Sequence, residues 1–130
     1  MYQEVHTDHI AARANAPEIG QWLQRFDACA RGPWGVSFEQ CRDEVMPRFG
    51  DDLMVLTPTG DGDYAFSHYG REIVRYVGAS RLRERVSAMT GQVAAFTITC
   101  CDRTLAEGRA TYTVHRSLAS VRVCLWERLL

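Results

Sequence analysis

The sequence carries almost no net charge and has no long apolar run. Its 15 Lys and Arg residues are balanced by 16 Asp and Glu residues, which gives a formal net charge of −1 at pH 7. Proteins that bind nucleic acid or anionic membranes usually carry a basic patch or an excess of positive charge. A membrane-spanning helix needs about 20 consecutive apolar residues. We therefore expect a cytoplasmic protein that has neither a nucleic-acid partner nor a membrane partner.

The cysteines lack the pattern of a disulfide framework or a zinc site. There are five of them, an odd number, and no C-x-x-C spacing occurs. The first ten residues, MYQEVHTDHI, are polar and do not resemble a secretion signal. We therefore expect reduced thiols and no metal site. A chain of 130 residues is long enough to bury a core without disulfide bonds or a structural metal ion.

The most strongly patterned stretch is DGDYAFSHYGREIVRYVGASRL, from Asp61 to Leu82. Glycines on either side of Asp61 predict a tight turn. The next residues alternate as in a β-strand, with Tyr64, Phe66 and His68 on one face and Ala65, Ser67 and Tyr69 on the other. At Gly70 the period changes to that of a short helix, and Gly78 is placed to end that helix in the left-handed conformation.

The residues before this stretch predict two helices and a strand. Residues 1–14 have little pattern and are expected to form an arm. Asn15 and Pro17 begin an amphipathic helix with an apolar stripe that packs either in the core or at a dimer contact: Ile19, Trp22, Leu23 and Phe26. A capping box from Ser37 to Gln40 begins a helix expected to end before Pro47. Residues 53–57 read as a strand that forms a hairpin with the strand at 63–69.

The residues after Gly78 predict further helices and a second hairpin. Ser80 is placed to cap a helix with an apolar side formed by Leu82, Val86 and Met89. The segment from Val93 to Leu105 fits either a strand or a helix by its residues alone. Residues 111–118 and 121–130 alternate as two strands of a hairpin. This order predicts an α+β fold with an antiparallel sheet and helices on one side.

The run D-Y-x-F-x-x-Y-G-x-x-I-V-x-x-x-G-x-S-x-L, from Asp63 to Leu82, resembles the signature of bacterial sensory PAS domains, and the final E-R-L-L resembles their ending. The resemblance implies a five-stranded antiparallel sheet with short helices over one face, and a helix at 93–105. It implies an N-terminal arm and amphipathic helix at 1–35 and a sensory domain at 36–130. The fifth strand is missing, so its position is open to a truncated strand, the N-terminal segment or a neighbouring chain.

The resemblance implies a sensor that binds a small ligand or a partner. A homodimer rearrangement would then control a signalling output domain outside this sequence, as in two-component or cyclic-di-GMP signalling. The cofactor is unknown: the reactive-cysteine segment of flavin-binding members is absent, and haem would have to use a cysteine. The expected ligand-binding residues are aromatic, histidine and cysteine side chains of the core: Tyr64, Phe66, His68, Phe96, Cys100, Tyr112, His115 and Trp126.

Two other functions remain open. A pure dimerisation scaffold would have the same fold and a filled core. A thiol-dependent enzyme would pair Cys100 or Cys101 with His68 or His115, and its thiol would need a low pKa and an exposed position in a cleft. No catalytic motif accompanies these residues, so we expect that the protein is not an enzyme.

Overall fold

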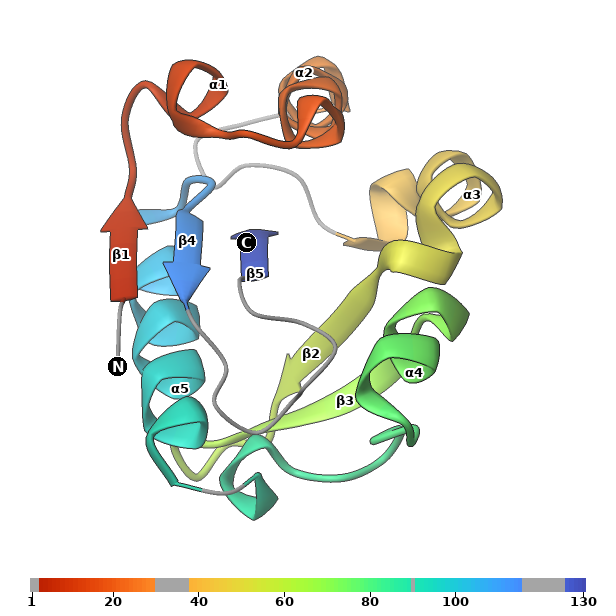
Figure 1. The fold of residues 1–130 in the computed structure, drawn as a ribbon, viewed down its shortest axis with the longest axis vertical. Helices are drawn as coiled ribbons and strands as arrows, with labels where there is room; N and C mark the ends of the chain where they lie inside the picture. The colour runs from red at the N-terminus through yellow and green to blue at the C-terminus, as the bar shows by residue number, and fades with distance from the viewer. Residues whose placement is uncertain (1–2, 30–37, 90, 116–125) are drawn as a thin grey trace. The chain divides into compact units, whose positions relative to one another are not determined.

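The computed structural model describes residues 3–29, 38–89, 91–115 and 126–130 (Figure 1). Among these residues, no helix combines the length and the apolar character needed to cross a bilayer. The fold is α+β, with helices and small antiparallel sheets. The residues group into two compact units, one formed by 1–41 and 100–130 and the other by 42–99. The domain boundary expected near residue 35 falls outside the described residues.

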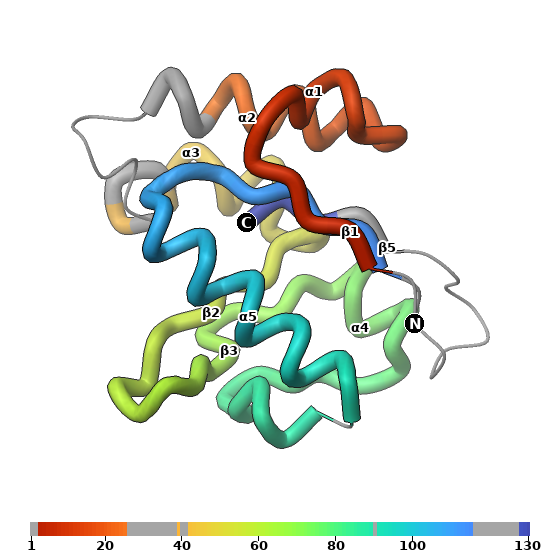
Figure 2. The backbone as a smooth tube through the Cα atoms, turned by 90° about the vertical axis from the view of Figure 1, so that its left-hand side faces the viewer, coloured from red at the N-terminus to blue at the C-terminus, as the bar shows by residue number. Residues whose placement is uncertain are grey.

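The first unit is built on a three-stranded antiparallel sheet with the order β1-β4-β5. These strands are β1 (Gln3–His6), β4 (Tyr112–His115) and β5 (Trp126–Leu129). The pairing of β4 with β5 confirms the second hairpin, whose connecting residues 116–125 lie outside the description. Residues 3–6 of the expected N-terminal arm form β1 and pair with β4 (Figures 1 and 2). The N-terminal segment therefore takes an edge position in this sheet.

Strand β4 is buried on both faces, which is why all four of its residues are inaccessible. Tyr112 and Val114 face an apolar cluster with Ile10 of α1 (Ile10–Arg13) and Ile19 of α2 (Pro17–Cys29). Leu23 of α2 packs against the same cluster, so these two members of the α2 stripe lie in the core of their own unit. The opposite face of β4 carries Thr113 and His115, because successive side chains of a strand alternate.

The second unit contains the predicted first hairpin, formed by β2 (Met54–Pro58) and β3 (Tyr64–Tyr69). Gly60 and Gly62 in its turn have φ angles of 86° and 85°, as the turn prediction requires. The expected strict alternation along β3 is wrong at its end, because the register shifts opposite Val55 and Leu56. The rings of Phe66 and Tyr69, expected on opposite faces, meet edge to face with centroids 5.3 Å apart.

The change from strand to helix at Gly70 is confirmed. Helix α4 (Arg71–Val77) follows it and ends at Gly78, whose φ of 93° lies in the left-handed region. The helix predicted to end before Pro47 continues instead, because α3 runs from Phe38 to Phe49. Pro47 lacks the N–H that would bond to the carbonyl of residue 43, so it removes one bond of the last turn, but the helix continues for two further residues. The 3₁₀ turn η1 (Gly50–Asp52) follows α3 directly.

The helix expected between Ser80 and Met89 is wrong. Arg83 has a φ of 71°, which an α-helix cannot contain, and only a short 3₁₀ turn, η2 (Val86–Ala88), forms. The backbone here bonds to β3 instead: the Arg83 N–H donates to the Phe66 carbonyl at 2.8 Å, and the Phe66 N–H donates to the Glu84 carbonyl at 3.0 Å. The helix predicted for 93–105 is confirmed as α5 (Gly91–Glu107).

The single five-stranded sheet implied by the resemblance is not formed by the described strands, which make two separate sheets. Strand β4 has both edges occupied, by β1 and β5. Strand β3 likewise has β2 on one edge and residues 83–85 on the other. Because each edge of a strand accepts one neighbour, neither β3 nor β4 has an edge free for a further strand.

Candidate functional site

Four of the eight expected ligand-binding residues belong to the second unit, where they serve its packing. Tyr64, Phe66 and Phe96 are buried. His68 is half-buried, and its Nε2 lies 2.7 Å from the Gly50 carbonyl oxygen, so this nitrogen donates to that oxygen. The bond ties β3 to η1. These residues behave as core and as a structural tether within their unit.

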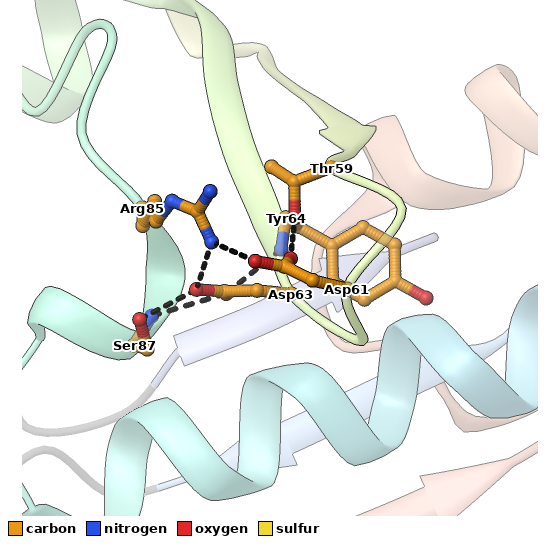
Figure 3. A network of polar contacts seen from close by, with 6 residues as sticks. All are labelled: Thr59, Asp61, Asp63, Tyr64, Arg85 and Ser87. Carbon is orange, nitrogen blue, oxygen red and sulfur yellow. Dashed lines mark hydrogen bonds and ion pairs between the residues drawn. The ribbon is translucent and has the colours of Figure 1, made fainter.

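A network of carboxylates and an arginine closes the β2–β3 turn (Figure 3). Asp63 accepts hydrogen bonds from the Tyr64 N–H at 2.8 Å and from both the N–H and the hydroxyl of Ser87. Asp61 accepts from Thr59 and from Arg85. These bonds lower the pKa of both carboxyl groups, that of Asp61 to about 2. The acceptor groups are used in fastening the turn to η2, so we assign this network a structural role.

The other four expected residues belong to the first unit, and the structure places the side chains of three of them on the two sides of its sheet. Tyr112 points into the apolar cluster. On the opposite face, Cys100 and His115 lie near Arg128 of β5, which donates from Nε to the Thr113 hydroxyl at 3.1 Å. Trp126 pairs with His115 in the strand register, and its side chain lies outside the described part of the chain.

We call this second face the polar layer: Cys100, Cys101, Thr111, Thr113, His115 and Arg128. Burial lowers the pKa of His115 to about 4, with a smaller contribution from the Arg128 charge. Burial also raises the pKa of the Cys100 thiol and brings that of Cys101 to about 11. At neutral pH the histidine is therefore uncharged and both thiols keep their protons.

These protonation states bear on the thiol-enzyme hypothesis. A catalytic cysteine acts as a thiolate, so its pKa is normally lowered and its sulfur reachable by substrate. Cys100 is 1% exposed and Cys101 is 6% exposed, and the pKa of each thiol is raised. Within the described residues, no group of three or more His, Cys, Asp or Glu side chains is placed to hold a metal ion. The polar layer is therefore suited to a structural role in the core.

A cleft of about 220 Å³ opens elsewhere in the first unit. We call it the arm cleft, and its lining comes from three places along the chain: Thr7, His9, Ile10, Leu23, Arg109 and Ala110. None of the eight expected residues is among them. The first three follow β1, Leu23 belongs to α2, and the last two form the turn that leads into β4.

The arm cleft is basic on one side and apolar on the other. Arg109 donates from its terminal nitrogen to the Thr7 hydroxyl at 3.0 Å and from Nε to Glu107 at 3.2 Å. Glu107 also accepts from Arg103 at 2.9 Å, a bond that lowers the pKa of its carboxyl group. Glu107 thus faces two guanidinium groups and cannot neutralise both of them.

His9 stands at the rim of the arm cleft in an unusual backbone conformation. Its φ of 51° and ψ of 34° are left-handed, and its carbonyl accepts hydrogen bonds from the N–H groups of Ala12 and Arg13, both at 3.1 Å. Histidine tolerates this region better than most residues, yet the conformation still carries strain. The first turn of α1 therefore fixes where the His9 side chain stands.

Sequence reasoning missed this cleft because its two halves are 102 residues apart, as the separation of Thr7 and Arg109 shows. Neither half has a motif of its own. The nearest local signal is the Gly108 that follows α5, whose φ of 61° turns the chain toward β4.

No protein-family model, no curated protein and no solved structure matches the chain.

Proposed function

We propose that this chain is a regulatory module that binds a small molecule in the arm cleft. Its response is a change in how firmly the N-terminal arm, residues 3–13, stays docked. The supporting observation is that the cleft is walled by both partners of this docking contact. Thr7, His9 and Ile10 come from the arm, while Arg109 and Ala110 come from the turn before β4. The proposal keeps the sensory role expected from the sequence and moves the ligand away from the eight expected residues.

Apart from Ile10, which is buried in the apolar cluster, the docked arm is held by a small number of contacts. Strand β1 contributes four residue pairs with β4, from Gln3 with His115 to His6 with Tyr112. The rings of His6 and Tyr112 stack with centroids 6.2 Å apart, and Arg109 bonds Thr7. Short terminal strands with partly exposed residues open at free energies well below that of global unfolding. Release of β1 and Thr7 is therefore the low-energy motion that we propose for this unit.

The binding site of a ligand that touches both walls of the cleft is complete only when the arm is docked. Such a ligand stabilises the docked state by RT ln(1 + [L]/Kd), which is about 2.7 kcal/mol when its concentration is a hundred times Kd. The undocked population would fall by about a hundredfold. Release would bare one edge of β4, and an exposed edge can accept a strand from another chain. The second copy of the chain, or the output domain, that is expected from the sequence would bind this exposed edge of β4.

Amide hydrogen exchange tests this proposal directly. The protein would be titrated with a library of small metabolites, and ligands of the cleft would be identified by shifts of the Thr7 and Ala110 amide resonances. For these ligands we expect slower exchange at the β1 amides, with the β3 amides of the second unit as an internal reference.

Two results would reject the regulatory role. Cleft ligands that leave β1 exchange unchanged would show that occupancy and arm docking are not coupled. A library from which nothing enters the cleft would favour the dimerisation scaffold, for which no ligand-dependent exchange is expected.

A further inference from the structure

We infer that the ligand of the arm cleft is a small organic carboxylate with a short apolar tail. Its carboxylate would bind Arg109, and its tail would lie on Ile10 and Leu23. This inference rests on the proposed function, because it names the chemical class of the ligand for that same cleft.

Arg109 supplies the group that recognises the acid. A guanidinium has five N–H donors in a planar fork, and the fork matches the two oxygens of a carboxylate. The bonds to Thr7 and Glu107 use two of these donors, so three remain for a ligand within the described part of the chain. Thr7 and Glu107 also hold the guanidinium in place, which reduces the entropy lost when a ligand binds.

The charges around the cleft favour an anion. Glu107 is the acidic group nearest to Arg109 in the contacts of this unit, and it is shared with Arg103. Asp8, next to the cleft residue Thr7, is paired with Arg13 at 3.6 Å. Asp8 thus has a cation of its own, and Glu107 divides its charge between two arginines, so part of the Arg109 charge is left to attract an incoming acid.

The floor of the cleft selects an organic acid over an inorganic anion. Ile10 is 6% exposed and belongs to the apolar cluster, while Leu23 and Ala110 pack against that cluster. Leu23 and Ala110 are only half-buried, so a phosphate or sulfate ion would leave their apolar surface uncovered, and burying that surface is favourable. The volume of about 220 Å³ is below the about 300–1,000 Å³ usual for drug-sized ligands, so the tail must be short.

Isothermal titration calorimetry at fixed ionic strength tests the class with three probes: hexanoate, the neutral isostere hexanamide, and inorganic phosphate. We expect hexanoate to bind at least about tenfold more tightly than either of the others, as a charged hydrogen-bonded pair allows. Arg109→Gln should weaken hexanoate by about tenfold and leave hexanamide unchanged. NMR spectra of ligand-free Arg109→Gln would confirm that the β1–β4 pairing persists.

Arg103→Gln is the matched control, because it removes the same charge from the other partner of Glu107 without changing the lining of the cleft. Its effect on hexanoate should be much smaller than that of Arg109→Gln.

Three outcomes would overturn the assignment of the ligand class. Equal losses in Arg103→Gln and Arg109→Gln would indicate general surface charge. Phosphate binding as tightly as hexanoate would indicate a nonspecific anion contact. Hexanamide binding as tightly as hexanoate would indicate a neutral ligand. In this last case the regulatory proposal would still stand if hexanamide slowed exchange at β1, so the two failures can be told apart.

Discussion

Gly70 lies so close to Asp51 that a Cβ atom on residue 70 would be 2.2 Å from the Asp51 carbonyl oxygen. The backbone at Gly70 has a φ of −65° and a ψ of 148°, which alanine can adopt, so the conflict is purely steric. If the backbone at residue 70 moved away from Asp51 to make room for the Cβ atom, the hydrogen bond from the residue 70 N–H to the Leu53 carbonyl, 2.9 Å long, would break. We predict that Gly70→Ala lowers the free energy of unfolding by roughly 3 kcal/mol or more, measured by urea denaturation.

Gly78→Ala is the control for this prediction. Gly78 has a φ of 93° and open space around its would-be Cβ, so alanine there meets only backbone strain. That strain should lower the free energy of unfolding by about 1–2 kcal/mol. Equal losses in the two variants would refute the steric account of Gly70.

The burial of His115 in the polar layer predicts that the free energy of unfolding depends on pH. Its pKa is about 4 in the folded chain and about 6.5 in an unfolded chain. Between these values the unfolded state binds more protons, so stability is full above about pH 6.5 and falls as the pH drops toward 4. The loss across this window should be about 3 kcal/mol. Urea denaturation at pH 7.5, 5.5 and 4.5 would measure it.

His115→Gln separates this effect from the titration of carboxylates. The variant cannot bind the proton, so its stability should vary less between pH 7.5 and 4.5 than that of the wild type. A parallel decline in both proteins would mean that His115 is not the group responsible.

The buried thiols predict slow chemistry at residues 100 and 101. With a pKa of about 11, Cys101 is almost entirely protonated at pH 8. We expect iodoacetamide to modify the peptide that contains both cysteines on the order of a hundredfold more slowly than it modifies glutathione. Mass spectrometry of quenched digests would give the rate. Labelling at the rate of glutathione would contradict the burial of these thiols and would revive the enzyme hypothesis.

The sequence predicts the local structure well where one residue dominates the backbone. Glycine at positions 60, 62 and 78 has the positive φ angles expected of it, and Pro17 is the first residue of α2. The helix from Gly91 to Glu107 was ambiguous by its residues, because β-branched side chains favour strands. Its apolar face decided the outcome, since helices gain most of their stability from packing.

The prediction failed where distant segments decide the structure. The spacing of Leu82, Val86 and Met89 fits a helix, yet the backbone of residues 83–85 pairs with β3 and forces Arg83 to a φ of 71°. Hydrogen bonds to a strand edge outweigh a short helical pattern that has little to pack against. The arm cleft escaped detection for the same reason, because contacts between residues about a hundred positions apart leave no local periodicity.

The place of β1 in the sheet has a consequence for synthesis on the ribosome. Its pairing partner, β4, begins only at Tyr112. At about 5–20 residues per second, the arm would wait roughly 5–20 seconds before that partner is translated. During this interval Val5 has no strand to pair with, and Ile10 lacks the two members of its cluster that β4 supplies, Tyr112 and Val114. The nascent arm therefore exposes apolar surface that a chaperone can bind before translation ends.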